Sequence, residues 1–174
     1  MTELTPAGDA APVVREKTIT WEDPLATAGA GAALSGLEFL RKVAAGEIPP
    51  PPIARLMGFG LGEVGEGVAE FVGTPDESVY NPIGMVHGGY VCTMLDSALG
   101  CAVHTTLPVG VAYTSIEIKV NYLRPVHANA GELRVLGRVT KPGRRVAFAE
   151  GDVRNAQGRV LATAQSSLLI MGPA

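Results

Sequence analysis

Residues 81–96 read NPIGMVHGGYVCTMLD and combine a turn, a glycine pair and a helical pattern. After the Asn-Pro turn, His87 precedes Gly88 and Gly89, and apolar residues then recur at helical spacing. Glycines in the first turn of a helix leave backbone N–H groups open to a ligand oxygen, which the helix dipole also favours. The same glycines suit close packing of a helix against a sheet, so both interpretations stay open at this point.

Asp96 is the one carboxylate in this helical pattern. No Lys or Arg occurs between Arg55 and Lys119, so no neighbour in the sequence forms an ion pair with it. Asp is a modest helix former, and a carboxylate among apolar residues is costly unless it is used. We interpret Asp96 as an acid/base group, with a carboxylate at the edge of the helix face, hydrated or bonded to a backbone group, as the alternative.

Asn81 and His87 flank the glycine pair, and each has two interpretations. An Asn-Pro pair is most often a turn, and a His before a helix is most often a structural hydrogen-bond partner. Alternatively, both side chains assist a reacting carbonyl group or a water molecule. The three histidines lack metal-ligand spacing and no nucleotide-binding glycine motif is present, so we expect no metal and no cofactor.

Composition narrows the classes of function. A chain of 174 residues suits one domain. Its hydrophobic content of 47% is high, and such an excess is often buried in subunit interfaces. The net charge of −3 argues against a general nucleic-acid binder. The most apolar stretch, residues 83–113, contains histidines, a carboxylate and glycines and does not suit a membrane span. No secretory leader is visible, and Cys92 and Cys101 lie too far apart on one helix for a disulfide, so we expect a cytoplasmic protein.

The order of elements predicts an α+β chain. Residues 1–33 lack any period and are expected to form a tail. A capping box at Ser35 and Glu38 predicts a helix over 36–45, followed by a proline run and one more turn over 53–57. Helical spacing predicts the longest helix over 87–106. Alternation predicts strands at 112–124 and 132–141, and turn signals between apolar segments predict further strands at 59–66, 67–73, 146–154 and 159–170. We therefore expect a tail and short helix over 1–52 and one domain over 53–174, in which an antiparallel sheet wraps the long apolar helix.

Positive charge gathers in the predicted hairpin turn over residues 141–145. Its Lys141, Arg144 and Arg145 stand out in an acidic chain. Charged hairpin tips commonly serve solubility, whereas two neighbouring arginines also suit the recognition of phosphate groups.

The stretch from Asn81 to Asp96, followed by Asn-Tyr-Leu-Arg-Pro at residues 121–125, resembles the hotdog-fold acyl-CoA thioesterases. The pattern is most similar to the phenylacetate-pathway and 4-hydroxybenzoyl-CoA thioesterases and covers roughly residues 53–171. The resemblance implies a hotdog fold, in which five or six strands wrap one helix, with an N-terminal helical extension here. It also implies homodimers or homotetramers whose active sites lie between subunits.

The resemblance implies a role for each residue of the pattern. The Gly88 amide would polarise the thioester carbonyl of an acyl-CoA, and Asp96 of the neighbouring subunit would act as general base or nucleophile. Asn81 and His87 would assist the carbonyl and the loop, and Ser115 would orient the attacking water, with Thr114 as a close competitor. The residues expected around the acyl group are Gly89, Cys92, Thr93 and Thr114. Those expected at the CoA phosphates are Arg124, Lys141, Arg144 and Arg145.

Two other functions remain open from the sequence. One is hydration or dehydration of an acyl thioester, although the His and carboxylate pattern expected for it is absent. The other is a noncatalytic acyl-CoA-binding protein. The preferred acyl group, the packing of the oligomer and the role of the first 52 residues are not determined by the sequence.

Overall fold

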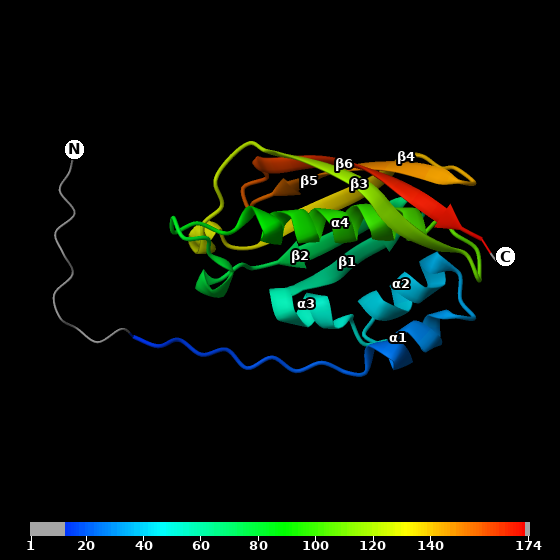
Figure 1. Ribbon diagram of the computed structural model, residues 1–174, viewed down its shortest axis with the longest axis horizontal. Helices are drawn as coiled ribbons and strands as arrows, with labels where there is room; N and C mark the ends of the chain where they lie inside the picture. The colour runs from blue at the N-terminus through cyan, green and yellow to red at the C-terminus, as the bar shows by residue number, and fades with distance from the viewer. Residues whose placement is uncertain (1–12, 173–174) are drawn as a thin grey trace.

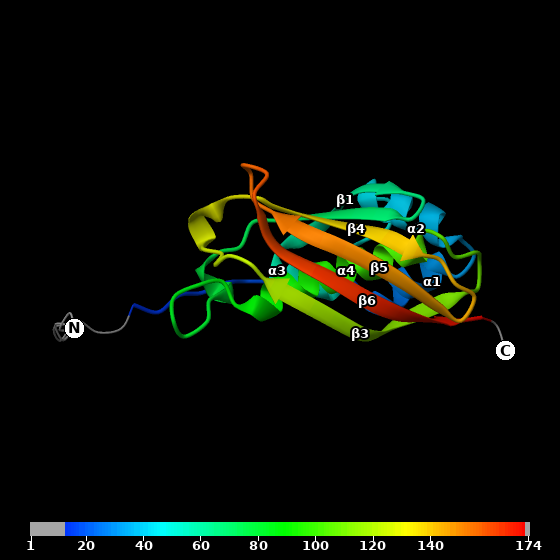
Figure 2. The same ribbon diagram turned by 90° about the horizontal axis from the view of Figure 1, so that it is seen from above.

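The computed structural model describes residues 13–172, and its core is one antiparallel sheet of six strands (Figures 1 and 2). The strands are β1 (Phe59–Gly65), β2 (Val68–Gly73), β3 (Ala112–Tyr122), β4 (Leu133–Lys141), β5 (Val146–Arg154) and β6 (Val160–Met171). Their order across the sheet is β1-β2-β4-β5-β6-β3, so β1 and β3 are the edge strands. All six predicted strands are confirmed.

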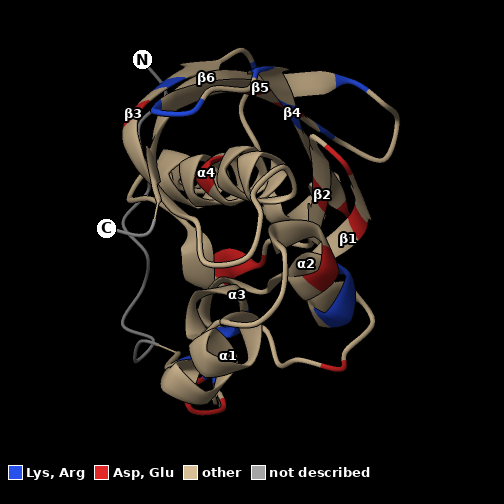
Figure 3. Ribbon diagram, turned by 90° about the vertical axis from the view of Figure 1, so that its right-hand side faces the viewer, with Lys and Arg blue, Asp and Glu red and all other residues tan. Residues whose placement is uncertain are grey.

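Helix α4 (Gly88–His104) lies against the concave face of this sheet and supplies the centre of the core. Seen end on, the sheet curves around one side of α4 in Figure 3. Tyr90, Met94 and Leu99 are almost fully buried there. The predicted long helix and the hotdog architecture are thus confirmed.

A glycine sets the distance between helix and sheet. An added Cβ at Gly137 of β4 would lie 2.4 Å from the carbonyl oxygen of Ala98 in α4. Backbone therefore packs against backbone at the middle of the core, and only glycine leaves room for it.

Three helices precede the sheet: α1 (Pro24–Gly31), α2 (Gly36–Ala44) and α3 (Pro52–Met57). The capping box predicted at Ser35 and Glu38 is present, with both reciprocal hydrogen bonds. The expectation that residues 1–33 form a tail is wrong over 24–31, where Asp23 caps α1 and Pro24 occupies its first turn. Residues 1–12 of that expected tail lie outside the described part.

Short 3-10 helices η1 (Glu77–Val79) and η2 (Ala128–Ala130) complete the secondary structure. Over residues 13–172, no helix has the length and apolar character needed to cross a membrane.

Candidate active site

Asp96 and Ser115 meet between α4 and β3. The Ser115 hydroxyl donates a hydrogen bond to Asp96 Oδ1 at 2.8 Å. Asp96 is exposed and Ser115 half-buried in the single chain, so the carboxylate is held in position and still open to a ligand. Neither residue is near the other in sequence, and the pair exists only because β3 crosses the helix here.

A bulge in β3 selects Ser115 over Thr114. The pairing with β6 shifts between Ser115 and Glu117, so Ile116 is the extra residue. Beyond the bulge Ile118 packs on the core, and an unbroken strand would then have placed Thr114 on the inner face. The bulge reverses this alternation and turns Ser115 inward. It also leaves Ile116 55% exposed.

The first turn of α4 presents a free amide. His87 is the N-cap, and its Nδ1 accepts a hydrogen bond from the Gly89 amide at 2.8 Å. Nδ1 therefore carries no proton in this arrangement, which leaves the hydrogen on Nε2. Among residues 13–172 no acceptor is found for the Gly88 amide. The hydroxyl of Tyr122, the last residue of β3, donates to the Gly88 carbonyl oxygen at 3.0 Å, so the end of β3 lies against this turn.

Asn81 builds the loop before the helix. The Asn81 side-chain Oδ1 accepts hydrogen bonds from the backbone amides of Ile83 and Met85, both at 3.1 Å. The Asn81 backbone amide donates to the Met85 carbonyl oxygen at 2.7 Å. These contacts favour the turn interpretation of Asn81, because its side-chain oxygen is occupied within the loop. Asn81 thus positions the residues that precede His87.

Within one chain, the free amide and the carboxylate are well separated. Gly88 and Asp96 are eight residues apart on α4, a rise of about 12 Å along the helix axis. A single carbonyl group cannot touch both groups of the same chain.

Two hollows meet at the Asp96–Ser115 pair, and these two residues line both. The larger is a mostly apolar cavity of about 790 Å³ between α4 and the N-terminal helices. The smaller, about 400 Å³, opens on the other flank along α4 and β3. The Asp96 carboxylate therefore lies where the apolar cavity meets the smaller hollow, which we call the groove.

The residues expected around the acyl group divide between these surroundings. Cys92 and Thr93 line the smaller hollow, whereas Gly89 and Thr114 line neither. The apolar cavity is formed by other residues, most of them from segments distant in sequence, which explains why spacing along α4 did not reveal it.

Three titratable residues that sequence reasoning did not assign to the site also line the cavity: Cys101, His104 and Tyr113. Burial raises the pKa of the Cys101 thiol to about 12 and lowers the pKa of His104. Burial likewise raises the pKa of Tyr113 well above its ordinary value. All three are therefore neutral near pH 7. The spacing of Cys101 and His104 from Asp96, five and eight residues on one helix, was the available signal.

The four cations expected at CoA phosphates do not gather in one chain. Arg124 follows the end of β3 and donates to the Val160 carbonyl oxygen at 2.7 Å. Lys141, Arg144 and Arg145 are exposed in the β4–β5 hairpin, at the end of the sheet where β3 begins. The 11 residues of β3 span about 35 Å, so these positions lie at opposite ends of the molecule.

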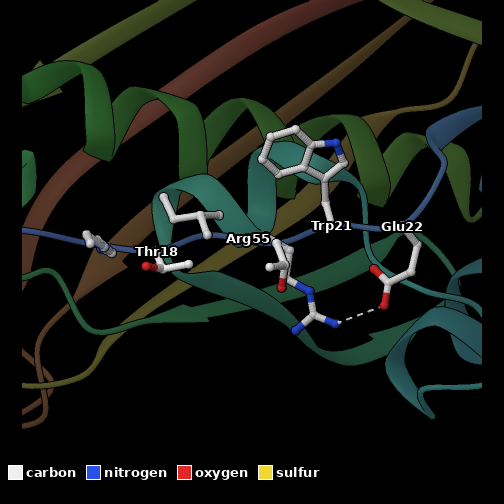
Figure 4. A pocket seen from close by; sticks show the side chains of 7 residues that line it. Thr18, Trp21, Glu22 and Arg55 are labelled. Carbon is white, nitrogen blue, oxygen red and sulfur yellow. Dashed lines mark ion pairs between the residues drawn. The ribbon is translucent and has the colours of Figure 1, made fainter.

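A further hollow of about 510 Å³ lies along the extended segment 17–22, away from Asp96. Figure 4 shows the Arg55 guanidinium approaching the Glu22 carboxylate, at 3.8 Å, while the Trp21 ring points away from that ion pair. None of the candidate catalytic residues lines this hollow.

Known proteins are similar in sequence to part of this chain. Residues 83–162 match the family model described as Thioesterase superfamily. A candidate esterase of Halobacterium salinarum is 41% identical over 69 residues, 38% of this chain and 44% of that protein. Mouse acyl-coenzyme A thioesterase 13 is 30% identical over 91 residues, 48% of this chain and 64% of that protein. The chain thus spans less than two thirds of the length of either curated relative.

Solved structures extend the match beyond this segment. The chain resembles the thioesterase superfamily in its fold and over residues 83–162, as the sequence pattern indicated. More particularly, it is similar to a candidate thioesterase from Ralstonia eutropha that is related to phenylacetic acid degradation. That structure aligns with a TM-score of 0.68 at 29% identity and covers 75% of this chain and 98% of its own.

Proposed function

We propose that this protein hydrolyses an acyl-CoA thioester to a free carboxylic acid and CoA. The observation that carries the proposal is the Asp96 carboxylate, oriented by Ser115 and standing where an apolar cavity joins an open groove. A thioester has the same division, with an acyl group on one side of its carbonyl carbon and a polar carrier on the other. The match to the thioesterase superfamily supports this choice of reaction.

The chemistry needs one donor and one base. The Gly88 amide donates to the carbonyl oxygen and stabilises the negative charge that develops on it. Asp96 either takes a proton from water, which attacks the carbonyl carbon, or attacks that carbon itself and forms an anhydride. In both routes the C–S bond breaks, and the thiolate of CoA leaves and takes up a proton. In the direct route water supplies the second oxygen of the product acid. In the anhydride route Asp96 supplies that oxygen, and water then opens the anhydride at the Asp96 carbon and replaces the oxygen that Asp96 lost.

A homodimer would bring the donor and the base together. The rise of about 12 Å between Gly88 and Asp96 on one helix supports a site in which each comes from a different copy. The opposite ends occupied by Arg124 and the 141–145 hairpin fit the same arrangement, because a CoA bound between two copies could meet cations from both.

Thiol release from acyl-CoA tests the proposal. Asp96→Asn keeps the size of the side chain and removes the base, so we expect the rate of thiol release to fall at least 1,000-fold, roughly the scale of losing a catalytic acid/base group. The thermal midpoint and acyl-CoA binding of this variant should remain close to those of the wild type. Near wild-type turnover by Asp96→Asn would overturn the role of Asp96.

Other products would identify the alternative functions. Addition of water to the acyl chain with no free thiol would indicate a hydratase, and tight binding with neither product would indicate a binding protein. For a hydrolase, single-turnover reaction in ¹⁸O-labelled water separates the two routes, because only the anhydride route leaves label in the Asp96 carboxylate.

A further inference from the structure

We propose that the N-terminal helices, residues 24–54, form one wall of the acyl-binding cavity, and that a neutral, apolar acyl group of medium length or an aryl group fills it. This inference rests on the proposed function for the identity of the ligand. It gives the N-terminal segment a role in substrate selection that the matched segment, residues 83–162, does not contain.

The cavity has two walls of different origin. One wall comes from α4 and from strands of the sheet, including Phe59, Phe71 and Tyr113. The other comes from α1, α2 and α3, with Leu40 and Val43 among the lining residues. Figure 3 shows these three helices on the side of α4 that the sheet leaves uncovered. Without them, the inner face of α4 near Asp96 would lie open to water.

The wall is attached firmly to the rest of the domain. The Gly36 amide at the start of α2 donates to the Leu107 carbonyl oxygen at 3.0 Å. An added Cβ at Gly36 would lie 1.8 Å from the His104 carbonyl oxygen, so α2 touches the end of α4 backbone to backbone. The Phe39 ring lies 5.8 Å from the His104 ring, and Leu40 is buried. The N-terminal segment therefore shapes the cavity as a fixed wall.

The lining selects for charge and size. No Lys or Arg is among the described residues that line the cavity, and the only carboxylate there is Asp96 at its junction with the groove. A charged group at the far end of an acyl chain would lose its hydration without a counter-ion, which is costly. The cavity follows α4 from Asp96 to His104, eight residues or about 12 Å, and its volume of about 790 Å³ far exceeds the needs of an acetyl group.

A length series of acyl-CoAs tests the wall directly by binding. Affinities for acetyl-, butyryl-, hexanoyl-, octanoyl- and phenylacetyl-CoA are measured by calorimetry on the Asp96→Asn background, which avoids turnover. We expect the affinity to rise up to about fourfold for each methylene buried, from acetyl to octanoyl. Glutaryl-CoA, whose acyl group ends in a carboxylate, should bind no better than butyryl-CoA.

A bulky residue on the wall should then shorten the series. Val43→Phe adds a ring on the cavity side of α2, and we expect it to lower octanoyl-CoA affinity at least tenfold while acetyl-CoA affinity stays within about twofold of its former value. Arg41→Phe adds the same ring at an exposed position of α2 that does not line the cavity, and it should leave the whole series unchanged.

The two proposals fail in different ways. A length dependence that Val43→Phe leaves intact, or an equal loss for every acyl group, would overturn the wall, even if the wild type releases thiol. Absence of thiol release by the wild type, together with a length dependence that Val43→Phe reduces, would overturn hydrolysis and still support the proposed wall. Thermal midpoints of both variants identify any loss caused by misfolding, and Val43→Ile then serves as a milder substitution with the same expected direction.

Discussion

Ser115→Ala removes one hydroxyl and with it the hydrogen bond to Asp96 Oδ1, at 2.8 Å. A hydrogen bond to a charged group contributes about 1.5–3 kcal/mol. Because Asp96 is exposed and Ser115 only half-buried in the single chain, we take the lower end of that range. A loss of about 1.5 kcal/mol in transition-state stabilisation lowers kcat/KM roughly tenfold. The expected change lies in kcat, because the hydroxyl orients the base and does not hold the acyl group.

Ser97→Ala is the matched control for this measurement. Ser97 lines the same cavity, but its hydroxyl donates to the Thr93 carbonyl oxygen within α4, at 2.9 Å. Steady-state thiol release from octanoyl-CoA should therefore be nearly unchanged in Ser97→Ala and about tenfold slower in Ser115→Ala. Equal rates for the two variants, or a loss confined to KM, would refute the view that Ser115 orients the carboxylate.

Two further predictions concern stability. Gly137→Ala forces a Cβ to within 2.4 Å of the Ala98 carbonyl oxygen. We expect the free energy of unfolding to fall by about 3 kcal/mol and Tm to fall by roughly 6–12 °C. Gly60→Ala is the control, because its added Cβ meets no atom within 4 Å and should shift Tm little. Burial lowers the pKa of His104 below its ordinary value of 6.5. As pH falls, the His104 imidazole of the unfolded chain therefore takes up a proton before that of the folded chain. The free energy of unfolding should then fall as pH drops from 7 through 6.5 toward the lower pKa of the folded state. Thermal melts across this range should lose that component in His104→Gln; an unchanged slope would show that His104 is not its source.

Local patterns in the sequence predict the fold well, because most of its elements follow short-range rules. Alternation and turn residues predicted the strands, and a capping box predicted the start of α2. Helix α1 was missed because its alanines and glycines offer no apolar stripe, although Asp23 before Pro24 is a helix-start signal in its own right. The first turn of α4 could also be predicted from the sequence, since the cap by His87 involves only neighbouring residues.

The remaining parts of the site depend on contacts between distant segments. Whether Ser115 or Thr114 faces Asp96 is decided by one extra residue in β3, and nothing in the strand's composition marks that bulge. The apolar cavity is likewise formed by α1 to α3 approaching α4, where the contact of Gly36 with His104 is a property of the packed chain alone.

The separation of Gly88 from Asp96 leads to the most decisive test of a shared site. Gly88→Pro removes the amide hydrogen at the first helical position, where proline is tolerated, and the extended conformation of His87 suits a following proline. An added Cβ would lie 3.1 Å from the Tyr122 ring, so a small shift of that side chain is expected and Tm must be measured. Gly88→Pro and Asp96→Asn should each be inactive alone.

Mixing the two inactive proteins under conditions that allow subunit exchange should restore activity. If each site takes its amide from one copy and its carboxylate from the other, a mixed dimer contains one site with an intact Gly88 and an intact Asp96. Random exchange makes half of the dimers mixed, and half of their sites intact, so about a quarter of wild-type activity should return. If both groups served the same site within one chain, every copy would carry a defect and the mixture would stay inactive. Activity that returns without exchange, immediately on mixing, would instead point to contamination by wild-type protein, which the separate assays of each variant detect.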